Sequence, residues 1–263
     1  MQLLDIATYF TSESDVSRVA KGRLDDADLS RLYAYPPRPR RPWIRANFVA
    51  SIDGAVEADG VSAGLGTPAD QAVFAVLRSL TDAVLVGAGT VRAENYGGVS
   101  LPDDTRRARV DRGLDELPPV VVVTASAELD PDARVFTDTT VTPIVVTTAA
   151  ASADKKKALS DAGARIVEAG ETTVTTGDLL GALDGLGLHR VLCEGGPGLF
   201  GQLIADDAVD DVCLTVSPLL VAGSAGRISH SASGAVRRMT RAHVVADDDG
   251  TLLTRWVKHR TEH

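Results

Sequence analysis

Aromatic residues and cysteines are scarce in this chain of 263 residues, which limits how its core and any metal site could be built. Aromatics make up 4% of the sequence, so the core must consist mainly of aliphatic side chains. The two cysteines, Cys193 and Cys213, each lie in an apolar run. We expect both to be buried thiols, because no Cys-x-x-Cys, His-x-Glu or His-Glu-x-x-His spacing is present to build a zinc site.

The sequence also lacks an excess of positive charge and any long apolar run. It has 27 Lys and Arg against 36 Asp and Glu, a formal net charge of −9. This balance argues against a general binder of nucleic acid or of anionic membranes, but it allows one local phosphate site. No apolar run reaches the ~18 residues of a membrane-spanning helix, and the first residues do not resemble a signal peptide. We therefore expect a soluble, cytoplasmic protein.

The first 42 residues differ in composition from the rest. Residues 25–33 could form a short helix, and residues 36–42 hold four prolines, which exclude a helix or a central strand. The three arginines among these prolines allow either a phosphate-binding patch or a solvated linker, and we favour the linker. We expect residues 1–42 to form an arm and a proline-rich connector that pack on one main domain, residues 43–263.

From Trp43 onward, apolar runs typical of buried strands alternate with helical patterns. The predicted strands cover 43–51, 82–87, 119–124, 143–148, 190–193 and 211–216. The predicted helices cover 67–80, 153–162, 176–185 and 197–205. Near the C-terminus, residues 242–246 and 252–257 flank a turn that ends in Gly250, which predicts a hairpin. The pattern indicates an α/β fold with a mostly parallel central sheet, flanking helices and an antiparallel C-terminal hairpin.

Polar and glycine-rich segments follow several of the predicted strands. In open α/β sheets, ligands bind beyond the carboxyl ends of the strands. Four such segments are present, namely Ser51–Gly54, Gly87–Thr90, Thr124–Ser126 and Glu194–Gly198. Because parallel strands end at the same edge of a sheet, these segments together predict a ligand site at that edge.

The segment Glu194–Gly198 (EGGPG) is the most informative of the four. Its glycines allow a close backbone approach, and Pro197 begins a helix whose free N–H groups favour an anion. The segment has neither the Gly-x-Gly-x-x-Gly spacing of a dinucleotide fingerprint nor the lysine of a P-loop. An ordinary tight turn explains the glycines, but it does not explain the ionisable Glu194 at the end of an apolar strand.

Four short motifs occur in an order that resembles the riboflavin-biosynthesis pyrimidine reductase family. They are residues 47–54 (NFVASIDG), 77–90 (LRSLTDAVLVGAGT), 194–197 (EGGP) and 210–218 (DDVCLTVSP), and the resemblance covers about residues 43–257. It implies a dihydrofolate-reductase-like fold and reduction, by NADPH, of the ribosylamino group of a pyrimidine ribosyl-5-phosphate. The hydride would be transferred to C1 of the ribosyl imine.

The arm carries a further resemblance. Leu32-Tyr33-Ala34-Tyr35, leading into the first strand, is similar to an actinobacterial subgroup that carries the reductase domain alone. Bifunctional members add an N-terminal zinc deaminase, whose His-x-Glu and Pro-Cys-x-x-Cys elements are absent here. We therefore expect reductase activity without deaminase activity.

The family resemblance also implies where NADPH binds. The pyrophosphate would contact the two glycine turns, and the nicotinamide would lie beside Ala50 and Ser51. The cofactor-binding residues implied are Ala50, Ser51, Val86, Gly87, Gly89, Thr90, Gly195, Gly196, Pro197, Gly198 and Leu199. By strand order, Thr124 and Ser126 are candidates near the adenosine 2′-phosphate, although turn capping explains them equally well.

On the substrate side, the resemblance implies a second set of residues. They are Asn47, Ser62, Thr67, Asp70, Arg78, Glu94 and Glu194. Arg78 could bind the ribose 5-phosphate or pair with a carboxylate, and Asp70 could bond the pyrimidine edge or cap its helix. The catalytic candidates are Glu194, as proton donor or sugar-orienting group, together with Asp70 and Asp53. Asp53 could equally form a turn before Gly54.

Two departures from the family pattern keep other functions open. Many members have Lys where this chain has Ala55, and Asn95 replaces the second member of an acidic pair after Glu94. The alternatives are an NADPH-dependent reductase of dihydrofolate or another pterin, and a non-catalytic NADP-binding module. We also expect a homodimer, because the C-terminal hairpin offers a sheet edge and Trp256 an apolar anchor.

Overall fold

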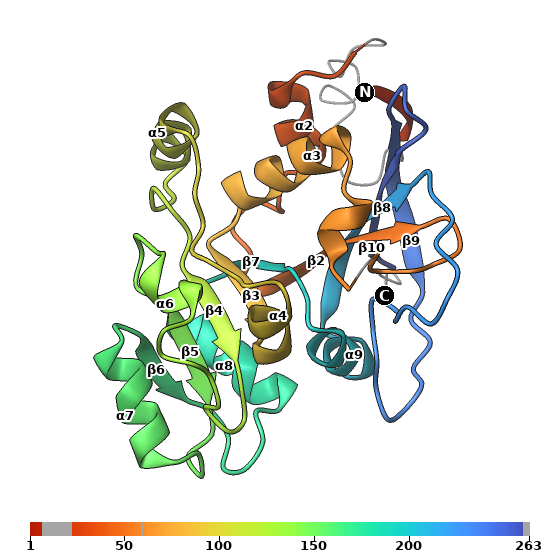
Figure 1. The fold of residues 1–263 in the computed structure, drawn as a ribbon. Coiled ribbons are helices and arrows are strands. Elements are labelled where there is room, and N and C mark those ends of the chain that lie inside the picture. The colour runs from red at the N-terminus through yellow and green to blue at the C-terminus, as the bar shows by residue number, and fades with distance from the viewer. Residues whose placement is uncertain (7–22, 59, 260–263) are drawn as a thin grey trace.

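The computed structural model describes residues 1–6, 23–58 and 60–259, and one sheet runs through this part of the chain (Figure 1). Its ten strands are β1 (Gln2–Ile6), β2 (Trp43–Ser51), β3 (Ala83–Gly87), β4 (Val120–Val123), β5 (Ile144–Thr147), β6 (Arg165–Glu168), β7 (Arg190–Cys193), β8 (Val209–Ser217), β9 (Met239–Ala246) and β10 (Leu252–Lys258). They lie in the order β1-β9-β10-β8-β2-β7-β3-β4-β5-β6.

The described helices connect these strands and cover the sheet. They are α2 (Asp26–Leu32), the 3₁₀ helix η1 (Ser62–Leu65), α3 (Pro68–Ser79), α4 (Ala88–Ala93), α5 (Asp103–Asp111), α6 (Arg134–Thr137), α7 (Ala153–Asp161), α8 (Thr176–Gly185) and α9 (Pro197–Ala205). The helix α3 begins as its sequence predicts, because the Thr67 side chain accepts a hydrogen bond from the backbone N–H of Asp70 and Pro68 occupies the first turn.

The predicted α/β architecture is confirmed. The strands from β8 through β2 and β7 to β6 are parallel to their neighbours, and β8, β10, β9 and β1 pair antiparallel. The C-terminal hairpin is β9–β10, as predicted. The sequence pattern did not predict β1 and β6, which occupy the two edges of the sheet. An edge strand such as β6 is partly exposed, so it lacks the continuous apolar run that marked the central strands.

Alternate residues of the strands build cores on both faces of the sheet. In β3, Val84 and Val86 pack with residues of α4, α6 and α7, whereas Ala83 and Leu85 pack with α8 and α9. A third cluster joins α2 and α3 to β8, β9 and β10. The short helix α2 of the arm therefore shares a core with α3, and the two lie side by side in Figure 1.

A buried charge network lies beneath α2. The guanidinium groups of Arg45 on β2 and Arg255 on β10 each approach the Asp211 carboxylate on β8 to 2.7 Å. The same arginines donate hydrogen bonds to the carbonyls of Tyr33 (2.5 Å) and Leu32 (2.6 Å) at the C-terminal end of α2. Burial alone would raise the pKa of Asp211, but the two arginines lower it. The helix carbonyls stabilise the second positive charge, which has no carboxylate of its own.

His243 on β9 lies beside this network, edge-on to the Tyr33 ring with the ring centroids 4.7 Å apart. Its side chain is buried, which with the nearby Arg255 lowers its pKa from 6.5 to about 3. As the pH falls below 6.5, the unfolded chain binds a proton at this position and the folded chain does not. The fold therefore loses about 1.4 kcal/mol of stability per pH unit from this one group.

We expect His243→Gln to flatten the pH dependence of stability. Between pH 6.5 and about 5, urea unfolding of the unmodified protein should show a loss of about 2 kcal/mol that the variant lacks. His189→Gln is the matched control, because His189 is half-exposed at the surface beside Asp184. Equal slopes for the unmodified protein and His243→Gln would contradict the assignment.

Other expectations from composition have mixed outcomes. Cys193 and Cys213 are free and buried, as predicted, and the described residues contain no group of three potential metal ligands. No helix in the described part of the chain is long and apolar enough to cross a membrane. The structure reduces the free sheet edge on which the homodimer prediction rested. β10 lies inside the sheet, and among the described residues β1 pairs with the His243–Ala246 part of β9. The homodimer itself stays a prediction.

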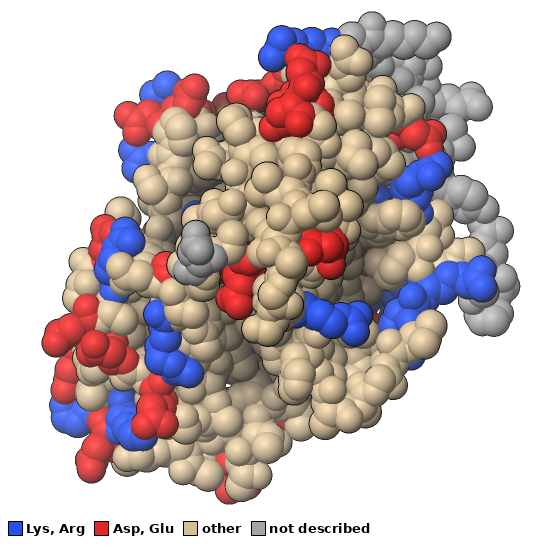
Figure 2. Space-filling model, turned by 45° about the vertical axis from the view of Figure 1, so that its right-hand side comes forward, with Lys and Arg blue, Asp and Glu red and all other residues tan. Residues whose placement is uncertain are grey.

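Charged side chains do not form one patch on the face shown in Figure 2. Acidic and basic groups are interspersed around it, and its hollowed lower centre is largely uncharged. The net charge of −9 therefore does not define a single acidic surface on this face.

Candidate active site

The candidate site lies at a step in the sheet, where one strand ends before its neighbour does. β2 and β7 pair only as far as Ala46 and Cys193, whereas β2 continues beside β8 to the pair Ser51 and Ser217. Glu194 is the first residue beyond β7 and therefore lies in this step. Asn47, the next residue of β2 after Ala46, comes level with it, and adjacent strands lie about 4.8 Å apart.

Glu194 forms a buried ion pair with Arg78, the penultimate residue of α3. The Arg78 Nε and Nη2 atoms lie 2.8 and 2.6 Å from the two carboxylate oxygens. The Glu194 side chain is 2% exposed and that of Arg78 18%. The sequence allowed either a phosphate contact or a carboxylate partner for Arg78, and the structure shows the carboxylate partner.

Tyr96 completes this group and was not predicted from the sequence. Its hydroxyl donates a hydrogen bond to Glu194 and accepts one from Arg78 Nη2 at 2.8 Å. Burial together with the Glu194 charge raises the pKa of Tyr96 well above its ordinary value, so the hydroxyl keeps its proton. Burial alone would lower the pKa of Arg78, but the neighbouring Glu194 raises it by more, so the guanidinium keeps its charge. A carboxylate held in this way orients a ligand better than it donates a proton.

Asp70 lies at the other end of α3. Eight residues separate it from Arg78, which is ~12 Å along a helix axis. Burial raises the pKa of Asp70, and the buried Thr215 of β8 only partly offsets this with a hydrogen bond. Thr67, predicted as a substrate contact, uses its hydroxyl to cap the helix at the Asp70 N–H (3.2 Å) and to accept a hydrogen bond from Thr251 (3.1 Å).

One side of the candidate site is formed by α3, by Glu194 and by the point where β7 ends beside β2. Asn47 and Arg45 are two residues apart on β2, so their side chains lie on the same face of the sheet. Arg45 packs beneath the arm, on the side of the sheet that α3 covers. The register therefore places Asn47 on the same side of the sheet as Arg78 and Glu194, with Asp70 further along α3. Polar groups at both ends of such a site suit a ligand that carries hydrogen-bonding groups along its length.

The two glycine turns pack against each other. The Gly87 N–H donates a 3.0 Å hydrogen bond to the Gly195 carbonyl. A Cβ on Gly196 would lie 3.4 Å from the Gly87 Cα, and Gly196 has a φ of 69°. Thr90 lies against this contact, 3.5 Å from the Cβ positions of Gly195 and Gly196. A Cβ at these positions would make only ordinary contacts, but the positive φ angles of Gly195 (123°) and Gly196 (69°) favour glycine whether or not a ligand binds.

Beyond this contact, the N-terminus of α9 is open. It has no side-chain cap and no acidic residue in its first turn, while Pro197 and Gly198 are exposed and Leu199 is half-buried. A Cβ on Gly198 would meet no atom within 4 Å. Free N–H groups with no competing carboxylate fit the diphosphate of a dinucleotide. α4 also begins at this edge, with Gly87 as its N-cap, and lies next to α9 in Figure 1.

Asp53 stabilises a turn. Its carboxylate accepts hydrogen bonds from the Ser51 hydroxyl (2.5 Å) and from the backbone N–H groups of Val221 (3.2 Å) and Ala222 (2.7 Å). These bonds lower the pKa of Asp53 to about 2. The group is ionised at neutral pH, which fits a structural clamp on the segment after β8 and not the predicted catalytic role. Ala55, at the family's lysine position, is buried and bonds through its backbone to Ser51.

The remaining predicted residues are spread along the same edge of the sheet. The Glu94 carboxylate accepts a hydrogen bond from the Ser62 N–H at 3.2 Å, which ties η1 to the end of α4. Ala50 and Val86 are buried within β2 and β3. Thr124 is buried after β4, and Ser126 is exposed two residues later. No hydrogen bond of the described residues joins this pair to the glycine turns, so their role near a 2′-phosphate stays a prediction. Gly89 is exposed at the start of α4.

The fold and this edge of the sheet agree with one family. A family model described as the RibD C-terminal domain matches residues 42–253. The chain belongs to this family. The predicted resemblance to riboflavin-biosynthesis pyrimidine reductases is confirmed, and so is the fold that it implied.

Several named proteins are similar to this RibD C-terminal domain. It is 30% identical over 189 residues to the 2,5-diamino-6-ribosylamino-4(3H)-pyrimidinone 5′-phosphate reductase of Methanothermobacter thermautotrophicus, a match that covers 71% of this chain and 82% of that protein. It is 31% identical over 195 residues to the riboflavin biosynthesis protein RibD of Mycobacterium tuberculosis, covering 73% of this chain and 47% of that one.

A comparison with a solved structure agrees with this family assignment. The pyrimidine reductase-like protein from Corynebacterium diphtheriae superposes with a TM-score of 0.74 at 26% identity, covering 84% of this chain and 93% of that one. Because proteins with these names are reductases, the RibD C-terminal domain described here belongs among the oxidoreductases.

Proposed function

We propose that this chain reduces the ribosylamino group of a pyrimidine ribosyl-5-phosphate, with NADPH as the cofactor. The observation that carries the proposal is the buried Glu194–Arg78 pair beside Asn47, at the strand edge where the open N-terminus of α9 fits a diphosphate. The similarity to a reductase of such a pyrimidine phosphate supports the choice of substrate.

When bound, NADPH supplies the hydride. The chain's own residues hold the two reactants: the N–H groups at the start of α9 bind the diphosphate, and the glycine turns set its distance from β3. Glu194, fixed in orientation by Arg78 and Tyr96, accepts hydrogen bonds from the sugar hydroxyls. Fixing the reacting carbon beside the hydride donor is the main task of such a site.

The reduction also needs a proton, and Asp70 is the best placed residue to hold one. Its pKa is raised by burial, which makes the protonated form more available near neutral pH. Glu194 is less suitable because its carboxylate pairs with Arg78, and Asp53 because its pKa is lowered to about 2. The family resemblance placed a proton donor at position 55, which is Ala in this chain.

The cofactor assignment predicts a charge effect at position 198. We expect Gly198→Asp to weaken NADPH binding at least about tenfold, because a carboxylate in the first turn of α9 repels the diphosphate. The fold should keep its stability, since a side chain at this position meets open space. Gly198→Asn is the matched control, with nearly the same shape and no charge. Calorimetric titration measures both, and equal weakening by Asp and Asn would contradict a charge effect.

A direct assay tests the proposed reaction. NADPH oxidation should require the pyrimidine ribosylamine 5-phosphate and should not occur with dihydrofolate. Turnover of dihydrofolate alone would make the chain a pterin reductase. Tight NADPH binding with neither substrate consumed would make it a non-catalytic NADP-binding module.

A further inference from the structure

A cavity lies at the opposite end of the parallel strands from the candidate active site. It has a volume of about 430 Å³ and is enclosed by α2, the proline-rich connector, the end of α3 and the loop after α5. Arg190, the first residue of β7, lines it, whereas Glu194 lies beyond the last residue of that strand. The cavity is therefore distinct from the site proposed for the reaction, and its size falls within the range of small-molecule sites, roughly 300–1,000 Å³.

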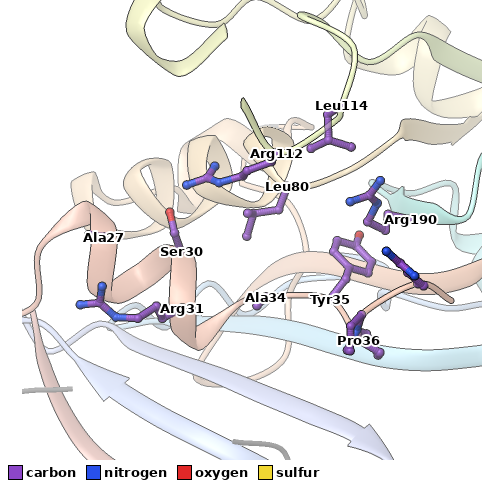
Figure 3. Close-up of a pocket in the computed structure, with 12 residues that line it drawn as sticks. Ala27, Ser30, Arg31, Ala34, Tyr35, Pro36, Leu80, Arg112, Leu114 and Arg190 are labelled. Carbon is purple, nitrogen blue, oxygen red and sulfur yellow. The ribbon is translucent and has the colours of Figure 1, made fainter. Parts of the chain in front are cut away.

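The lining of this cavity is strongly basic. Four of its twelve described residues are arginines, Arg31, Arg38, Arg112 and Arg190, and none is acidic. The chain as a whole has an excess of nine acidic residues. Figure 3 shows that these arginines come from separate elements, with Arg31 on α2, Arg112 after α5 and Arg190 on β7 around the same space. A positive cavity on an acidic protein is a local recognition feature and not a general property of its surface.

Two of these arginines are not used by the fold. Arg31 pairs with Asp28 at 2.5 Å, and Arg190 pairs with Asp82 at 3.0 Å. Within the described part of the chain, neither the guanidinium of Arg38 nor that of Arg112 has a salt bridge or a hydrogen bond. Arg38 also has a φ of 51°, an unfavourable conformation for a residue with a Cβ, and its side chain lines the cavity.

The floor of the cavity is apolar, with the ring of Tyr35 beside it. Leu80 and Leu114, both buried, face the connector across it. Figure 3 shows Tyr35 beside Arg190, and the guanidinium of Arg45 lies over the Tyr35 ring, 4.0 Å from its centroid. The Tyr35 hydroxyl is buried, and burial raises its pKa to about 12, so it keeps its proton.

We propose that this cavity binds a phosphate-bearing small molecule with a ring, of the mononucleotide class. Arg38 and Arg112 supply the positive charge for the phosphate, because a guanidinium matches phosphate oxygens and these two groups have no competing carboxylate. The apolar floor receives the ring. The ligand bridges the connector to Leu80 at the end of α3, so its binding stabilises the packing of the arm on the main domain.

Calorimetric titration with adenosine 5′-monophosphate tests the proposal. The titration is done with NADPH at saturation, so that the α9 site is occupied. We expect saturable binding of the monophosphate, competition by inorganic phosphate and no binding of adenosine. The double variant Arg38→Ala/Arg112→Ala should weaken binding at least about tenfold, since each arginine supplies a charge-assisted hydrogen bond. It should fold normally, because neither side chain has an ionic partner to lose.

The matched control is Arg40→Ala/Arg107→Ala. Arg40 and Arg107 are both exposed, and neither lines the cavity. Arg40 lies in the connector two residues after Arg38, and Arg107 lies on α5 five residues before Arg112. The control should bind the monophosphate as the unmodified protein does. Equal binding by both double variants, or no saturable heat at millimolar monophosphate, would overturn the proposal. Gly198→Asp should leave this binding unchanged, so failure at one site is distinguishable from failure at the other.

Discussion

Replacing Asp211 by Asn is expected to destabilise the fold by about 3–5 kcal/mol, the typical cost of leaving a buried charge without its partner. Asn keeps the shape of the side chain and removes the charge that Arg45 and Arg255 share. Both arginines are buried, so water cannot replace the lost carboxylate. Urea unfolding should show a lower midpoint with an unchanged m-value.

Two further variants make this test specific. Arg255→Met leaves one arginine with one aspartate, so it should cost less than Asp211→Asn although Leu32 loses its hydrogen bond. Asp207→Asn should change stability by no more than about 0.5 kcal/mol, because Asp207 is half-exposed and pairs with Lys258 and Arg237 at the surface. A cost for Asp211→Asn no larger than that of Asp207→Asn would show that the network adds no net stability.

The largest effect on activity is expected from Glu194→Gln. This change should lower kcat/KM about 100-fold, because the amide cannot hold the bidentate geometry with Arg78 and so loses its fixed orientation toward the substrate. NADPH binding should be unchanged, since the start of α9 does not depend on the carboxylate. Turnover and calorimetric titration of the cofactor measure the two effects separately.

Tyr96→Phe and Glu168→Gln are the controls for this prediction. Tyr96→Phe removes one hydrogen bond to Glu194 and leaves the ion pair, so it should cost about tenfold in kcat/KM, near the 1.5 kcal/mol of a bond to a charged group. Glu168→Gln alters a half-exposed carboxylate paired with Lys156 and should have no effect on turnover. Unchanged turnover in Glu194→Gln would remove Glu194 from the proposed site.

Most of the sheet and its main helices were predictable from local pattern. Central strands such as 83–87 and 120–123 are buried on both faces, and a strand of that kind requires a continuous apolar run. The start of α3 was predictable because Thr67, Pro68 and Asp70 act within one turn of chain. Short helices such as α4 and α6 carry weak signals, and they were missed for that reason.

The candidate site was predictable as a position and less so as chemistry. Polar residues at strand ends locate the edge, since parallel strands end together. That Arg78 pairs with Glu194, 116 residues further along the chain, depends on how α3 lies over the end of β7. The same holds for Tyr96, which no motif marks and which reaches Glu194 only through the turn after α4.

The motifs, the strand pattern and the helix start signals are properties of adjacent residues, so the chain sequence alone was enough to determine the family and the α/β class. Which charges meet is a property of packing. Asp53 binds the backbone of Ala222, and Arg78 pairs with Glu194, because the fold brings residues distant in sequence within hydrogen-bond distance. In the same way, α2 of the arm packs into one hydrophobic core with α3. The arginine-lined cavity arises in the same way, from five parts of the chain that meet only in the folded protein.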